Sequence, residues 1–124
     1  MTILKTTLFF IALISLSLFT ACTPKPTISG SVFKGTITEG PNSSELTITF
    51  ANNAKMQVKH VAQLPSDGTW ALAKGNEAVS LQWNNFSAFS GTPALNKKCT
   101  TIKGTVDATF FGDTTTYTIN LSKQ

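Results

Sequence analysis

The side chains that could perform chemistry are few and scattered in this 124-residue chain. His60 is the only histidine, and it lies at the end of an expected strand, where a structural role is commoner than that of a base. The six acidic residues are spread singly, so none forms a pair spaced for general acid–base catalysis. No group of His, Cys, Asp and Glu has the spacing of a metal site. The sequence therefore predicts a protein that is not an enzyme and needs no metal or cofactor.

Cys99 follows two lysines, Lys97 and Lys98, whose positive charges would favour its thiolate. One interpretation is a disulfide with a partner or with a second copy of the chain. The other is a small buried residue at the start of an expected strand over 100–110. Cys22 is the only other cysteine; if it is not modified, a Cys22–Cys99 disulfide is a further alternative.

Three large aromatic side chains, Trp83, Phe86 and Phe89, lie in or beside the irregular stretch 83–98. If they are exposed, they would form a contact patch or the mouth of a ligand site. If they are buried, they would close the open end of a small β fold. The sequence leaves both interpretations open.

The first 22 residues have a separate character. Lys5 precedes an apolar run over 8–19, which is shorter than the roughly 20 residues that a spanning helix needs. The run is followed by Phe19-Thr20-Ala21-Cys22, which resembles the lipobox of bacterial lipoproteins, where signal peptidase II cuts before a lipidated cysteine. The resemblance implies that residues 1–21 are a signal peptide and that acylated Cys22 binds a membrane. Because Thr23 and not Asp follows the cysteine, it further implies the outer membrane.

The rest of the chain is of a size for one domain. Residues 22–31 contain two prolines and predict an extended tether, with the domain over 32–124. After Cys22 there are nine lysines, no arginine and six acidic residues. Because the lysines are scattered and not clustered on one segment, the composition argues against a nucleic-acid partner.

Apolar and polar residues alternate along each segment of the domain, and no segment has the period of an amphipathic helix. The segments are short, rich in threonine and bounded by Gly, Asn, Asp or Pro. This pattern predicts an all-β fold: a small antiparallel β-sandwich or β-barrel of about seven or eight strands, built from hairpins.

Three turns set the register of this sheet, because cross-strand partners share a face. The predicted pairs are Leu72 with Val79 and Trp70 with Leu81 across a two-residue type II′ turn at Gly75-Asn76, Phe50 with Met56 and Ile48 with Val58 across a three-residue loop, and Phe110 with Tyr117 across a four-residue loop over 112–115.

Residues 74–78, Lys-Gly-Asn-Glu-Ala, are similar to the Lys-Gly-Asp-Glu-Ala turn of the membrane-bound lysozyme inhibitors, which are small lipid-anchored β-barrels of the cell envelope. Ser66 and Trp70 correspond to the Ser and Tyr of that family's Ser-Gly-x-x-Tyr motif. The resemblance implies an inhibitor loop formed by Ser66, Trp70 and Lys74, with Ser66 reaching into the lysozyme cleft. The positive net charge of the domain would oppose steering toward lysozyme, which is itself cationic.

Three functions are thus open. The leading expectation is a lipid-anchored binding or structural module of an envelope assembly, with an envelope protein as its partner. The alternatives are a lysozyme inhibitor and a receptor for a glycan or a small hydrophobic ligand. A carrier of hydrophobic ligands would need a sizeable apolar cavity, whereas a packed barrel would have none.

Overall fold

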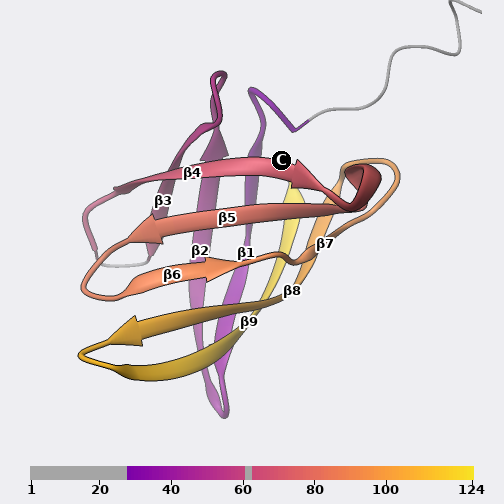
Figure 1. Ribbon diagram of the computed structural model, residues 1–124. Helices are drawn as coiled ribbons and strands as arrows, with labels where there is room; N and C mark the ends of the chain where they lie inside the picture. Colours follow the sequence, from indigo (N-terminus) through magenta and orange to yellow (C-terminus); the bar gives the residue numbers. More distant parts are fainter. Residues whose placement is uncertain (1–27, 61–62) are drawn as a thin grey trace, which may run out of the picture.

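The computed structural model describes residues 28–60 and 63–124, whose strands are all paired antiparallel (Figure 1). In chain order they are β1 (Val32–Glu39), β2 (Asn42–Phe50), β3 (Lys55–His60), β4 (Ser66–Ala73), β5 (Ala78–Asn84), β6 (Ala88–Gly91), β7 (Ala94–Leu95), β8 (Thr101–Phe110) and β9 (Asp113–Lys123). A single 3₁₀ turn, η1 (Lys74–Asn76), lies between β4 and β5. The all-β prediction is confirmed for these residues.

The sheet closes on itself. Its strand order is β4-β3-β2-β1-β9-β8-β6-β5, and β5 pairs again with β4. These eight strands form a barrel, and the short strand β7 pairs with both β5 and β8 beside it. Of the two architectures left open by the sequence, the fold is therefore the barrel.

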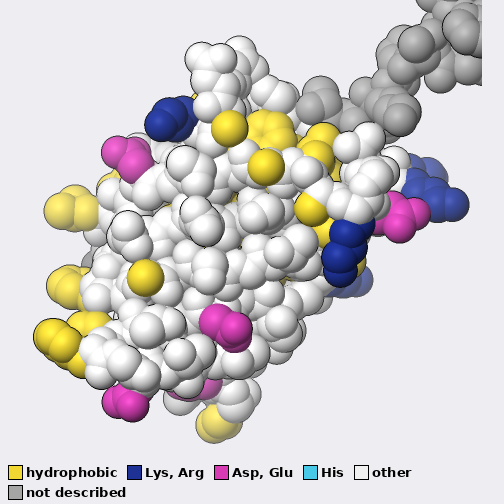
Figure 2. Space-filling view, viewed as in Figure 1, with side chains coloured by type: hydrophobic (Ala, Val, Ile, Leu, Met, Phe, Trp, Pro, Cys, Tyr) yellow, Lys and Arg dark blue, Asp and Glu magenta, His cyan; other side chains and the backbone are white. Residues whose placement is uncertain are grey.

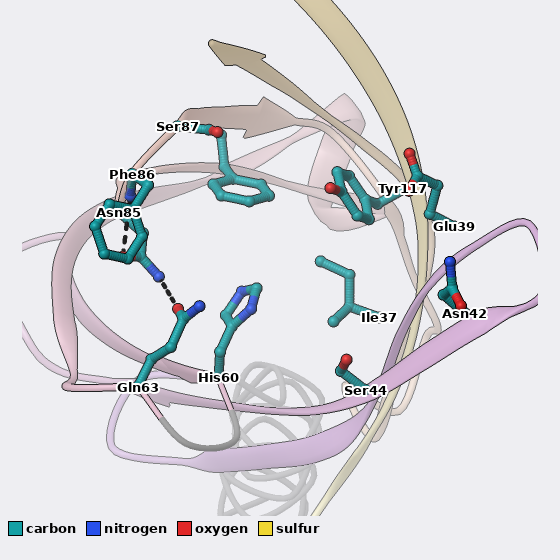
Figure 3. Close-up of a pocket in the computed structure, with 11 residues that line it drawn as sticks. Ile37, Glu39, Asn42, Ser44, His60, Gln63, Asn85, Phe86, Ser87 and Tyr117 are labelled. Atoms are coloured by element: carbon teal, nitrogen blue, oxygen red, sulfur yellow. Dashed lines mark hydrogen bonds between the residues drawn. The ribbon is translucent and has the colours of Figure 1, made fainter.

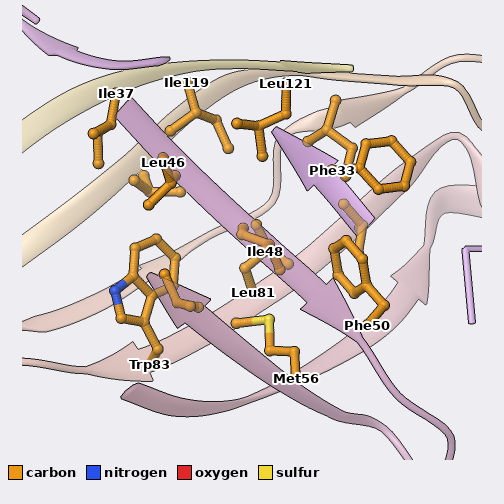
Figure 4. Packing of buried hydrophobic residues seen from close by; sticks show 14 of the residues in the cluster. Phe33, Ile37, Leu46, Ile48, Phe50, Met56, Leu81, Trp83, Ile119 and Leu121 are labelled. Carbon is orange, nitrogen blue, oxygen red and sulfur yellow. The ribbon is translucent and has the colours of Figure 1, made fainter. Parts of the chain in front are cut away.

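Inward-facing residues of the alternating pattern fill the barrel. The β2 residues Leu46, Ile48 and Phe50 are at most 1% exposed, while Thr47 and Thr49 between them face outward. They pack against side chains from the other strands, among them Leu81 and Ile119 (Figure 4). The interior is thus a packed core, and the sizeable apolar cavity of a hydrophobic-ligand carrier is not what this core provides.

The packed domain begins earlier than the predicted boundary at Val32. Ile28 is fully buried in the core, and the Gly30 amide donates a hydrogen bond of 2.8 Å to the Phe50 carbonyl. Ser31 is also buried, and its carbonyl accepts a bond of 2.9 Å from the Phe50 amide. Residues 28–31 therefore belong to the barrel and not to the tether. The rest of the predicted tether, residues 22–27 with Cys22, and the predicted signal peptide, residues 1–21, lie outside the described residues.

Two of the three predicted registers are confirmed. Phe50 pairs with Met56 across the three-residue loop, and Leu72 pairs with Val79 across the β4–β5 turn. The length and the type of the second turn were wrong. The ladder ends at the pair Ala73–Ala78, so four residues, 74–77, connect the two strands. Both Gly75 and Asn76 have positive φ angles, of 65° and 73°, whereas a type II′ turn has positive φ only at its first central residue. Asn tolerates this left-handed conformation because its short side chain bonds locally.

The third register was wrong by four residues. Phe110 pairs with Asp113, and Tyr117 pairs with Val106, so the β8–β9 turn contains only two residues, Phe111 and Gly112. A slip of four residues leaves every side chain on the same face of the sheet, so alternation cannot distinguish the two registers. The threonine-rich start of β9 pairs with β8 through polar contacts, such as the 2.7 Å bond from Thr116 Oγ1 to Asp107 Oδ1.

Within the described residues, no helix has the length and hydropathy that a membrane span requires.

Candidate functional site

A pocket of about 330 Å³ opens at one end of the barrel, which we call the mouth (Figure 3). The ends of β1, β2 and β3 contribute one side of it, and the β5–β6 loop, β6 and β9 contribute the other. The lining side chains are Ile37, Glu39, Asn42, Ser44, His60, Gln63, Asn85, Phe86, Ser87, Phe89 and Tyr117. The mouth therefore gathers residues that are far apart in the sequence.

Tight turns hold the two sides of the pocket in place. Glu39 pairs with Asn42 across a two-residue turn in which Gly40 has a φ of +55° and is followed by Pro41. This conformation is the one that glycine supplies at the first central position of a type II′ hairpin turn. The short turn places Glu39 and Asn42 side by side at the rim.

His60 is the last residue of β3 and lies half-buried in the pocket floor. It shares the inward parity of Val58, and its ring centroid is 5.7 Å from that of Phe89. Its Nε2 atom is buried and has no hydrogen-bond partner among the described residues. Burial disfavours the charged imidazolium and lowers the pKa of His60 from its usual 6.5. The floor of the pocket is thus neutral at pH 7.

Aromatic rings form the base beneath His60. The rings of Trp83 and Phe89 stack with centroids 4.7 Å apart and an interplanar angle of 3°, and Tyr117 lies 5.7 Å from Phe89. Trp83 and Phe89 are only 2% and 7% exposed. Of the two interpretations left open for Trp83, Phe86 and Phe89, the contact patch does not apply to the three together: Trp83 and Phe89 are buried and close the barrel, and Phe86 alone of the three is exposed. The two rings stack because Trp83 of β5 and Phe89 of β6 are direct cross-strand partners on the inward face of the barrel.

The rim of the pocket is polar and almost uncharged. Asn85 Nδ2 donates a hydrogen bond to Gln63 Oε1, which joins the β5–β6 loop to the segment before β4. Asn85 Oδ1 in turn accepts a bond of 3.0 Å from the Phe86 amide. Glu39 is the only acidic residue among the lining residues, and no lysine is among them. Figure 3 shows Tyr117 and His60 directed into the pocket from different sides.

The three residues of the inhibitor loop do not come together. Ser66 begins β4, whereas Lys74 follows its last residue, so they lie about 26 Å apart at the rise of a β-strand. Trp70 is between them and has a structural role, because its Nε1 donates to the carbonyls of Ala51 and Lys55 at 3.1 and 2.9 Å. Nothing in this arrangement resembles a single protruding loop.

Cys99 lies in the turn before β8 and is 4% exposed. Its amide donates a hydrogen bond of 2.9 Å to the Asn96 carbonyl, and its side chain packs in the core cluster. This placement agrees with the interpretation of Cys99 as a small buried residue. A disulfide with another chain would require this turn to open.

Several pocket residues were not singled out by the sequence. Asn42 and Ser44 of β2, Gln63 before β4 and Tyr117 of β9 come from three separate segments, and each is an ordinary polar residue. Their proximity follows from barrel closure, for which a single sequence carries no signal. Among residues 28–60 and 63–124, no group of three or more His, Cys, Asp or Glu side chains is placed to hold a metal ion.

Comparison of the chain with protein-family models, with curated proteins and with solved structures finds no match.

Proposed function

We propose that this protein is a non-enzymatic binding module of the cell envelope, anchored to the outer membrane by acylated Cys22, and that its barrel mouth binds a small uncharged ligand. The ligand presents hydroxyl or amide groups on a ring, as the sugar units of an envelope glycan do. The observation that carries the proposal is the pocket at the mouth, with an aromatic base and an amide and hydroxyl rim.

The chemistry of the rim selects this ligand class. Asn and Gln side chains each offer donors and an acceptor, and the hydroxyls of Ser and Tyr offer both. Such groups match a ligand whose own groups are hydroxyls and amides. An anionic ligand would find no lysine here to pair with and would lie near Glu39, and buried unpaired charge is costly.

The base of the pocket contributes the apolar part of binding. Phe89, Tyr117 and Ile37 give the pocket its apolar lining, in keeping with ligand sites that combine apolar walls with a few polar groups. The interior of an eight-stranded barrel is just wide enough to be filled by side chains or to hold one small ligand. Here the core fills the interior, so the ligand would bind in the pocket at the mouth. Because burial lowers the pKa of His60, this residue adds no positive charge to the pocket at pH 7.

A titration monitored by amide chemical shifts tests the ligand half of this proposal. Neutral mono- and oligosaccharides, including N-acetylated ones, are expected to shift the side-chain amide signals of Asn42, Gln63 and Asn85. Asn42→Ala should weaken binding, and Tyr117→Phe should weaken it by removing one hydroxyl. Asn120→Ala is the matched control, because Asn120 is an exposed asparagine of β9 outside the pocket. Equal binding in all three variants would contradict a site at the mouth.

The proposed acyl anchor at Cys22 has a separate test. Protein extracted from membranes is expected to have the mass of a chain beginning at Cys22 with its acyl groups attached. Cys22→Ser should abolish both the cleavage and the acylation. An intact mass without acyl chains would contradict the anchor but would leave the ligand proposal standing.

A further inference from the structure

The exposed hydrophobic side chains of the described residues gather at the mouth. Six large hydrophobic residues are exposed, and four of them lie on turns at this end: Leu64 (86% exposed), Phe86 (83%), Phe110 (49%) and Phe111 (91%). The other two, Val32 and Leu72, lie elsewhere and are only 36% and 37% exposed. Scattered exposed hydrophobics are ordinary, but a gathering of this kind marks an interaction surface.

The three turns that present them are neighbours in space. The bond from Asn85 to Gln63 joins the segment of Leu64 to the β5–β6 loop. The pairing of Ala88 with Thr109 places that loop beside the end of β8. In Figure 1 the start of β4 and the β5–β6 and β8–β9 connections all lie on the left, and Figure 2 shows hydrophobic side chains projecting along that side. We call Leu64, Phe86, Phe110 and Phe111 the apolar tips.

Phe111 occupies a turn position at which asparagine is the preferred residue. It is the first residue of the two-residue β8–β9 turn, where its φ is +49° and Gly112 follows with +84°. Two successive positive φ angles define a type I′ turn, for which Asn-Gly is the preferred pair. A bulky residue in this conformation is strained. Phe111 is therefore unfavourable both for its backbone and for its almost complete exposure, which makes the position a candidate for function.

The chemistry around the tips indicates what they contact. Residues 63–66, 84–88 and 109–112 contain no charged side chain, and the nearest charges along the chain are acidic, Asp67 and Asp113, the latter the cross-strand partner of Phe110. All eight lysines of the described residues lie on other segments, so attraction to phosphate does not drive contact here. The tips form two small groups, the Phe110–Phe111 pair with ring centroids 4.4 Å apart and Leu64 with Phe86 around a shared hollow. Four side chains are far fewer than the roughly 20–30 residues that each side of a stable protein interface contributes. Uncharged protrusions of Leu and Phe suit the boundary between lipid headgroups and acyl chains, which adapts to their shape.

We propose that the apolar tips form a docking surface that inserts into a lipid bilayer and turns the barrel mouth toward it. The contact is separate from the acyl anchor, because it resides in the barrel itself. The pocket of the mouth then faces the headgroup layer, so a ligand that carries a polar ring on a lipid could enter it directly.

Vesicle co-sedimentation tests this proposal. Residues 28–124 contain all eight barrel strands and every described core residue, so this fragment is used without the N-terminal segment, whose own apolar run would bind vesicles. A cooperative melting transition first establishes that it is folded. The fragment is expected to sediment with neutral phosphatidylcholine vesicles equally at low and high salt, because no charge takes part.

One variant separates docking from folding. Phe111→Asn places the preferred residue in the turn, so the melting temperature should rise by about 4 °C. The same change removes a buried phenyl ring from the membrane contact and should lower the vesicle partition coefficient about tenfold. Phe86→Ser should lower it similarly. Val32→Thr is the control, since it removes an exposed apolar group away from the mouth and should leave the partition coefficient unchanged.

Three outcomes would overturn the proposal. The first is a fragment that stays in solution with neutral vesicles. The second is binding restricted to anionic vesicles and lost at high salt, which would assign it to the scattered lysines. The third is a dimer, detected by light scattering, that Phe111→Asn dissociates, because the tips would then contact a second copy of the chain.

Discussion

Gly35 is the glycine position at which the closed barrel leaves the least room for a side chain. It lies in β1, between Leu46 of β2 and Leu121 of β9. A Cβ atom at this position would lie 1.9 Å from the Asn120 carbonyl oxygen and 2.9 Å from the Leu121 Cα. Both are backbone atoms, so no side-chain rotation relieves the contact. Gly35→Ala must therefore push β9 away from β1.

The size of the effect follows from these distances. An ordinary contact of this kind is at least 3.4 Å long, so the strands must separate by about 1.5 Å, which stretches a backbone hydrogen bond well beyond its usual length. Overpacking costs about 1–3 kcal/mol, and weakened backbone pairing adds about 1 kcal/mol for each bond. We expect Gly35→Ala to lower the free energy of unfolding by about 3 kcal/mol, a large share of the roughly 5–15 kcal/mol of a whole domain.

Urea unfolding followed by tryptophan fluorescence measures this change. Thr36→Ala, at the exposed neighbouring position of the same strand, is the control and should shift the midpoint little. The sign is decisive, because at an open strand position Ala is more stable than Gly by about 0.5–1 kcal/mol. A Gly35→Ala variant as stable as the parent would refute the close approach of β1 and β9, and with it the closure of the barrel.

Three further outcomes test other parts of the structure. Ile28→Ala should lower the free energy of unfolding by about 2–4 kcal/mol in the same urea assay; no effect would show that the packed domain begins later. Trp70→Phe should cost about 1–2 kcal/mol, because the carbonyls of Ala51 and Lys55 lose their shared donor. The lowered pKa of His60 means that the unfolded chain binds its proton more readily, so stability should be fully present above pH 6.5 and fall as the pH drops below it. Urea midpoints of His60→Gln should lack this decline; a decline unchanged in the variant would assign it to other groups.

The sequence predicted strand pairing best where a turn and its flanking residues agreed. Phe50 and Met56 are both buried and flank a loop of Asn, Asn and Ala, so matched apolar partners and turn residues indicated one register. At the β8–β9 turn the two signals conflicted. Apolar matching favoured pairing Phe110 with Tyr117, whereas the structure uses a two-residue turn that begins with a phenylalanine. A turn that departs from residue preferences cannot be recognised by them.

Local sequence patterns could not predict barrel closure or the pocket, for a different reason. The pairing of β1 with β9 joins segments about 85 residues apart, and alternation within each strand says nothing about which strands are neighbours. Ile28 shows the same limit at a smaller scale. Its neighbours in the sequence are polar residues, glycine and prolines, which indicate a tether. In the structure Ile28 is buried in the core, beside the end of β2 that carries Phe50.

The departures from local rules then have a physical meaning, because several of them meet at the mouth. Phe111 combines the strain of a positive φ angle with the exposure of its ring. Two buried ring nitrogens, His60 Nε2 and Trp83 Nε1, have no hydrogen-bond partner among the described residues. Substitutions that remove such costs are easy to find in sequence space, and selection for stability alone would accept them. The opposite end of the barrel, where Val32 lies, exposes far less hydrophobic surface. If stability were the only requirement, unfavourable features would not be expected to lie together at one end of the barrel. Their position around the pocket is the physical ground for proposing both ligand binding and membrane docking at the mouth.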